Sequence, residues 1–161
     1  MAASDVSQWV DRIYSSVEAV RNAHFSLVWL AGGISAERSL LLSGVAERLK
    51  CPHLRVGRQL SAALLDLSPR LRAVSAEDSV QDLLLATEAD MICLDHLDIL
   101  FDPSLRLNAV DMIQNASRRF VLVASWPGTI HRKSLSFGPE DHPAHLRISL
   151  QQLSSPVITL P

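Results

Sequence analysis

The sequence predicts an α/β fold in which a mostly parallel β-sheet is flanked by helices. Three short apolar runs, Phe25–Ala31, Met91–Leu94 and Phe120–Ala124, contain almost no polar residues, which is typical of strands buried on both faces. Longer segments between them repeat apolar residues every three or four positions, as amphipathic helices do. Strands that alternate with helices form parallel sheets, so the chain is expected to build one such sheet.

Length and composition fit one globular domain. The chain has 161 residues, of which 48% are hydrophobic and 20% are charged, so it is long enough to bury a core. We expect residues 1–22 to form an amphipathic helix packed on an α/β domain of residues 23–161. An alternative is that this helix docks on a partner protein.

The overall charge of the chain does not favour nucleic-acid binding, although a local basic patch remains possible. Fifteen basic and seventeen acidic residues give a net charge of −2, so no overall electrostatic attraction to nucleic acid is expected.

Cys51 and Cys93 lie in no C-x-x-C motif and are interpreted as reduced, structural thiols. No signal peptide and no apolar run of about 20 residues is present, which predicts a cytoplasmic protein without a membrane segment.

The predicted elements follow one another in a regular order. The N-terminal helix is indicated by apolar residues at helical spacing from Val6 to Val20. The remaining elements are a strand at 25–31, a helix at 36–49, a short strand at 51–57, a helical segment at 59–74 interrupted before Pro69, a helix at 75–89, a buried strand at 90–103 that ends in acids, a helix at 103–119, a strand at 120–125 and one strand near 146–150.

Glycines directly follow the first predicted strand, in the order G-G-I-S-A-E-R-S from Gly32 to Ser39. A phosphate-binding P-loop has the pattern G-x-x-x-x-G-K-[ST] between a strand and a helix. Gly32 and Gly33 fit the tight turn, and Ser39 stands where the hydroxyl group that binds Mg²⁺ belongs. Arg38 replaces the lysine and Glu37 replaces the second glycine, so the motif is degenerate.

Glu37 is the more serious departure. Its carboxylate would compete with phosphate for the positive end of the helix dipole. Two like charges about 4 Å apart at an effective dielectric constant near 20 repel by roughly 4 kcal/mol before screening. This figure is an upper limit, because Glu37 could instead rotate to solvent or pair with Arg38. We nevertheless expect Glu37 to cap its own helix at the place where phosphate would bind.

The strand at Met91–Leu94 ends in Asp95, which matches the Walker B pattern of an Mg²⁺-binding aspartate. His96 stands where a catalytic glutamate often follows, and Asp98 is the remaining candidate for a catalytic role. Ser125 ends the next strand and matches the position of a polar sensor residue. Taken alone, each acid also fits a solvated strand end or a helix cap.

Other polar clusters give weaker signals. His142 and His145 lack further metal ligands and are interpreted as surface histidines. Two basic clusters, Ser117–Arg119 and His131–Lys133, are candidates for phosphate contacts or for arginines that act on a neighbouring subunit, although solvated surface residues are the default. Trp126 is expected to be buried against the sheet rather than exposed for stacking.

The second half of the chain resembles the BrxF family, small P-loop proteins of type 3 bacteriophage-exclusion (BREX) defence systems. The resemblance rests on L-D-H-L-D-I-L-F-D-P at Leu94–Pro103, on S-R at Ser117–Arg118, on V-A-S-W-P-G at Val123–Gly128 and on His142–Pro143. It implies a P-loop NTPase-like fold of the AAA+/ASCE type and membership of a multiprotein complex that blocks phage DNA.

By position, the resemblance implies a nucleotide site formed by Gly32, Gly33, Arg38, Ser39 and Asp95. To this set the residues themselves add Glu37 and Ser125, with Ser39 and Asp95 on Mg²⁺ if ATP binds.

Three functional hypotheses follow. We favour an adaptor subunit of the defence complex with weak or absent ATP hydrolysis and no required cofactor. The alternatives are an active ATPase that binds ATP and Mg²⁺, and a DNA-loading accessory related to replication-initiator ATPases. The expected partners are other BREX proteins and further copies of this chain, with DNA reached through partners or the basic clusters.

Overall fold

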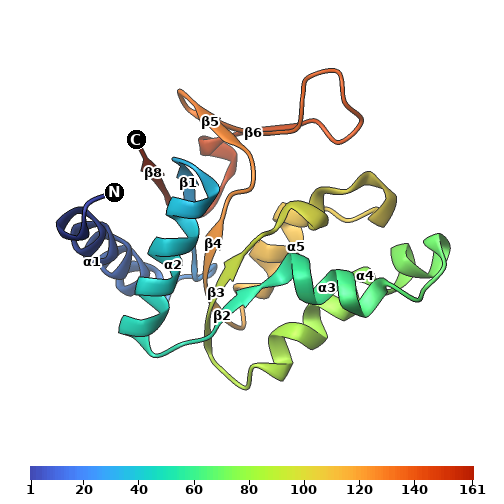
Figure 1. The fold of residues 1–161 in the computed structure, drawn as a ribbon, viewed down its shortest axis with the longest axis horizontal. Helices are drawn as coiled ribbons and strands as arrows, with labels where there is room; N and C mark the ends of the chain where they lie inside the picture. Colours follow the sequence, from blue (N-terminus) through green and yellow to red (C-terminus); the bar gives the residue numbers. More distant parts are fainter.

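The computed structural model describes residues 1–161 and contains a five-stranded sheet between layers of helices (Figure 1). The strand order is β2-β3-β4-β1-β8, and every neighbouring pair is parallel. The prediction of a mainly parallel sheet flanked by helices is therefore confirmed. The five strands are β1 (Leu27–Gly32), β2 (His53–Arg55), β3 (Met91–Asp95), β4 (Val121–Ser125) and β8 (Val157–Leu160).

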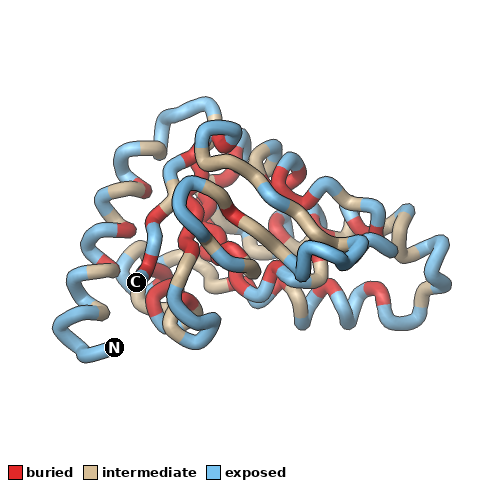
Figure 2. The backbone as a smooth tube through the Cα atoms, turned by 90° about the horizontal axis from the view of Figure 1, so that it is seen from above, coloured by how far each residue is buried: buried red, intermediate tan, exposed pale blue.

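Helices cover both faces of this sheet, and Figure 2 shows the buried residues concentrated between the layers. Two helices share an apolar core with one face, and three helices share a larger core with the other. The first group is α1 (Ala3–Val20) and α2 (Ser35–Leu49), and the second is α3 (Val56–Leu64), α4 (Pro69–Ala86) and α5 (Ala109–Ala116). Three short 3₁₀ helices are η1 (Asp98–Phe101), η2 (Pro103–Leu105) and η3 (Leu150–Gln152).

The amphipathic pattern of the N-terminal segment produces helix α1. Val10, Ile13 and Val17 lie on its buried side, because residues three and four apart share one face of a helix. This side packs against α2 and β1.

Helix α4 is one continuous helix, whereas the sequence predicted a break between residues 74 and 75. Ser68 is its N-cap and accepts a hydrogen bond from the Leu71 amide, and Pro69 is its first residue. A proline is well tolerated at this position because its missing N–H would have no helical partner. The start signal therefore lies at Ser68, not at Ser75.

The helix predicted at 103–119 is wrong in its first half. Residues Pro103–Leu105 form only a 3₁₀ turn, and Arg106 adopts a left-handed conformation with φ 52° that ends it. Helix α5 then begins after Asn108, whose side chain accepts a hydrogen bond from the Asp111 amide.

The C-terminal tail contains the four strands β5 to β8, whereas the sequence predicted only one strand, near residues 146–150. Three of these strands form a small antiparallel sheet of order β5-β6-β7. In the sequence, this sheet lies between β4 and β8. Its strands are β5 (Thr129–His131), β6 (Ser134–Phe137) and β7 (Leu146–Ser149). Trp126 lies fully buried beneath it, in edge-to-face contact with Trp29 and Phe101, as expected for a buried rather than a stacking residue.

The edge strand β8 explains why Gly32 must be a glycine. Gly32 has φ 81°, and a Cβ atom there would lie 2.4 Å from the Leu160 carbonyl oxygen. Both the left-handed backbone and this close approach exclude a side chain.

Gly32→Ala is therefore expected to lower the free energy of unfolding by more than about 2 kcal/mol, because strain and a backbone clash add together. Gly138→Ala is the matched control. Gly138 also has a positive φ of 73°, but a Cβ there would meet its nearest atoms at 3.6 Å, so only about 1 kcal/mol is expected. Urea denaturation of both variants makes the comparison, and equal losses would contradict the role of β8.

Candidate functional site

The turn that joins β1 to α2 is shorter than a P-loop requires. Only Gly33 and Ile34 separate the end of β1 from Ser35, the first residue of α2. A P-loop surrounds phosphate with the backbone amides of an extended loop. Here the residues from Ser35 to Glu37, which would belong to that loop, are already helical.

The Glu37 carboxylate occupies the N-terminal end of α2. Its Oε2 atom accepts a hydrogen bond from the Ile34 amide at 3.1 Å, which is the N3 half of a capping box. The same oxygen would lie 2.8 Å from a Cβ atom at Gly33, so Gly33 makes room for this carboxylate. The helix end therefore carries an anion supplied by the chain itself.

Arg38 is buried at the carboxyl edge of the sheet, with 6% of its surface exposed. Its Nε atom donates to Ser125 Oγ at 3.0 Å, and Nη1 donates to the carbonyl oxygens of Gly32 at 2.8 Å and Gly33 at 3.1 Å. These bonds tie α2 to the ends of β4 and β1. Nη2 has no hydrogen-bond partner in the protein.

Burial lowers the pKa of Arg38, and the negative charges of Asp95, Asp98 and Glu37 oppose this effect. None of these carboxylates forms an ion pair with the guanidinium group. Arg38 is therefore a buried cation that is solvated mainly by carbonyl and hydroxyl oxygens.

Asp95 lies at the end of β3 and is 1% exposed. Its Oδ2 atom accepts hydrogen bonds from Ser39 Oγ at 2.6 Å and pairs with His53 Nε2 at 3.1 Å. Its Oδ1 atom accepts from the His96 amide at 2.9 Å and lies 3.1 Å from His96 Nδ1. The carboxylate is therefore contacted from α2, β2 and the turn after β3.

These contacts determine the ionisation of Asp95. Burial raises its pKa, but the hydrogen bonds from His53, Ser39 and His96 together outweigh burial and hold the pKa well below its ordinary value. The carboxylate is therefore ionised at neutral pH.

The structure brings most of the predicted residues together, but not all of them. Arg38 joins Gly32, Gly33 and Ser125, and Ser39 joins Asp95. Asp98 is exposed at the start of η1 and has no hydrogen-bond partner. Its negative charge acts on Arg38 only through space.

His53 is the site residue that sequence reasoning missed. Strand β2 pairs with β3 so that Arg55 is opposite Asp95, and side chains two residues apart share one face. His53 therefore lies diagonally across from Asp95. The sequence does show His53 as a polar residue in a short predicted strand. It does not show that this strand pairs with the strand that ends in Asp95.

Further candidate metal ligands do not converge. No group of three or more His, Cys, Asp or Glu side chains is arranged to hold a metal ion. His142 and His145 instead stabilise their own loop, through the Ala144 amide and the Gly138 carbonyl oxygen. Ser39 and Asp95 remain the two residues whose oxygen atoms suit Mg²⁺.

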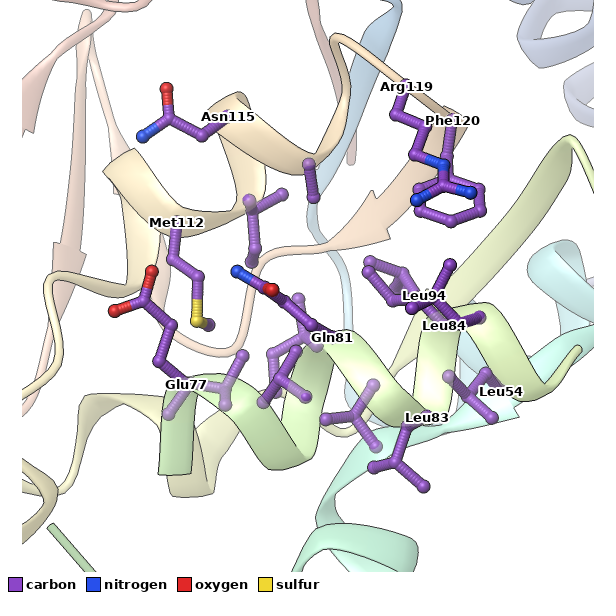
Figure 3. A pocket seen from close by; sticks show the side chains of 17 residues that line it. Leu54, Glu77, Gln81, Leu83, Leu84, Leu94, Met112, Asn115, Arg119 and Phe120 are labelled. Atoms are coloured by element: carbon purple, nitrogen blue, oxygen red, sulfur yellow. The ribbon is translucent and has the colours of Figure 1, made fainter. Parts of the chain in front are cut away.

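A separate apolar cavity of about 250 Å³ lies between α4 and α5, on the face of the sheet opposite α2 (Figure 3). Thirteen of its 17 lining residues are hydrophobic, and the polar residues are Glu77, Gln81, Asn115 and Arg119. The cavity walls come from elements far apart in the chain, so no local sequence pattern indicated this cavity.

Comparison with protein-family models, curated proteins and solved structures finds no match for this chain. No helix has both the length and the apolar character that crossing a membrane requires.

The low pKa of Asp95 predicts a pH-dependent contribution to stability. A carboxylate whose pKa is depressed in the folded state stabilises the protein above its unfolded pKa of about 3.9, and this contribution is lost as pH falls through the folded value. Asp95→Asn is expected to lower the free energy of unfolding by about 1–3 kcal/mol at pH 7, with a smaller difference below about pH 4. Urea denaturation of the native chain and of Asp95→Asn between pH 7 and pH 3 measures the loss of stability and its change with pH.

Asp98→Asn is the matched control, because Asp98 is exposed and unbonded. Its effect is expected to stay within about 0.5 kcal/mol at every pH. An Asp95→Asn difference that did not change with pH would contradict the electrostatic explanation.

Proposed function

We propose that this chain is a P-loop NTPase-like protein whose phosphate site is closed by its own residues, and that it acts as an assembly or adaptor subunit. The observation that carries the proposal is the Glu37 carboxylate on the Ile34 amide. This contact fills the helix end that phosphate would use. The turn of only Gly33 and Ile34 supports the same conclusion, since it leaves no extended loop.

A P-loop ancestry is supported by two further observations. Strand β4 lies between β1 and β3, and a strand inserted between the P-loop strand and the Walker B strand is the arrangement of ASCE-type NTPases. Ser39 donates to Asp95 at 2.6 Å, as expected for the two residues that would share an Mg²⁺ ion. The residues of the degenerate motifs are therefore adjacent in space and not only similar in order.

The proposed biological role is in a cytoplasmic anti-phage defence complex of the BREX type. Its support is the resemblance of Leu94–Pro103 and Val123–Gly128 to the BrxF pattern. These segments span the carboxyl ends of β3 and β4, which are neighbouring strands. The partners of such an adaptor would be other proteins of the defence complex and further copies of this chain.

An active ATPase is the second candidate. It is favoured by Arg38, a buried cation without an ion pair whose Nη2 atom is free to meet phosphate. In this alternative, Ser39 and Asp95 would hold Mg²⁺ and Asp98 would orient the attacking water molecule. A DNA-loading role has weaker support, since the net charge of −2 provides no general attraction to DNA.

Calorimetric titration of Mg·ATP and Mg·ADP separates the two main candidates. We expect no binding heat from the native chain at micromolar concentrations. The variant Glu37→Gly with Arg38→Lys is expected to bind, because it removes the competing anion and restores both residues of the motif. The variant Glu37→Gln tests the effect of the negative charge alone, because the glutamine amide oxygen can still accept the hydrogen bond from the Ile34 amide.

The triple variant that adds Ser39→Ala is the control, and its binding should fall at least tenfold if Mg²⁺ is held as proposed. Thermal melts show that each variant is folded before titration. Micromolar binding by the native chain would overturn the adaptor proposal, and hydrolysis would then be compared with that of Asp98→Asn.

A further inference from the structure

Two free cysteines lie close together on neighbouring strands. Cys51 precedes β2, Cys93 lies within β3, and their Sγ atoms are 3.9 Å apart. The sequence predicted reduced, structural thiols, because neither cysteine lies in a C-x-x-C motif and Cys93 lies in an apolar run. The pairing of β2 with β3 brings them into contact.

The cysteine pair is adjacent to the Asp95 cluster. Cys51 contacts Cys93, and His53 contacts Asp95, with the same sequence separation of 42 residues in both pairs. Cys51 precedes His53 by two residues, and Cys93 precedes Asp95 by two residues. Side chains two residues apart share a face of a sheet. The two pairs are therefore successive diagonal contacts on one face, which is the face covered by α2.

The two thiols differ in accessibility. Cys51 is partly exposed, whereas Cys93 is fully buried, so an oxidant in solution can reach only Cys51. This asymmetry is that of an attacking thiol and a resolving thiol.

We propose that Cys51 and Cys93 form a dithiol that peroxides oxidise to an intrachain disulfide. The Cys51 sulfur attacks one oxygen of hydrogen peroxide, so that an S–O bond forms and the O–O bond breaks, and Cys51 becomes a sulfenic acid. The other peroxide oxygen leaves as hydroxide and takes up the thiol proton to give water. The Cys93 sulfur then attacks the sulfenic sulfur and forms the disulfide bond. The hydroxide that it displaces takes up the Cys93 proton and leaves as a second water molecule. In total, two thiols and one hydrogen peroxide give one disulfide and two water molecules.

Disulfide formation would alter the neighbouring contact. The sulfur atoms must approach from 3.9 Å to about 2.0 Å. Strand β2 is a three-residue edge strand that pairs only with β3, so it is the element free to move. Because His53 belongs to the same short strand, oxidation is expected to change its hydrogen bond with Asp95.

The test uses the full chain, reduced with a phosphine, freed of reductant and titrated with hydrogen peroxide. Intact mass and alkylation of remaining thiols should show a monomer that has lost two hydrogen atoms and both free thiols, and dithiothreitol should restore it. In Cys93→Ala, Cys51 should stop at a sulfenic acid that dimedone traps. In Cys51→Ser, the buried Cys93 should not react over the same range.

A second measurement reads the predicted coupling. The imidazole NMR signals of His53 should shift on oxidation of the native chain and stay unchanged when Cys51→Ser is treated identically. Formation of covalent dimers, accumulation of sulfinic acid without a disulfide, or thiols that react only after unfolding would each overturn the proposal. These outcomes concern sulfur chemistry and do not depend on whether nucleotide binds.

Discussion

The ionised Asp95 carboxylate is the interaction on which the carboxyl edge of the sheet depends. Ser39 of α2, His53 of β2 and His96 after β3 all contact it, so one buried charge fixes three elements relative to one another. A buried carboxylate is stable only when its oxygens are fully hydrogen-bonded. The backbone turns sharply directly after Asp95, where His96 adopts a left-handed conformation with φ 54° and its amide donates to Asp95 Oδ1.

The same need to satisfy buried polar groups explains the rest of the edge. Arg38 cannot remain buried without partners, and it obtains them from the end of β1 and from Ser125. Glu37 in turn satisfies the Ile34 amide at the start of α2. Most of the groups that a P-loop protein would offer to a nucleotide are thus paired within the chain, with Arg38 Nη2 as an exception. The fold holds them in place as structural contacts, whether or not a ligand ever reaches them.

Local patterns predicted the elements of the parallel sheet that carry the motifs, and long-range pairing accounts for what was missed. Asp95 and Ser39 could be assigned to one edge because parallel strands end together and each residue lay in a recognisable motif. His53 could not, since its place depends on which strand β2 joins. Strand β8 (Val157–Leu160) also escaped prediction, because a four-residue strand after a serine–proline segment carries little periodic signal.

The closed site can be weighed against a bound nucleotide with simple magnitudes. A phosphate at the start of α2 would have to displace Glu37 from the Ile34 amide, which costs about 1 kcal/mol for the hydrogen bond. Repulsion from a carboxylate that stayed nearby adds up to roughly 4 kcal/mol. Together these terms weaken binding by about three to four powers of ten, which moves a micromolar site to millimolar or weaker. Attraction to Arg38 offsets part of this loss, but its Nε and Nη1 donors are already used by the protein. A partner protein that drew Glu37 away would remove the largest unfavourable term, so the proposed adaptor would open this helix end only within an assembly that reaches it.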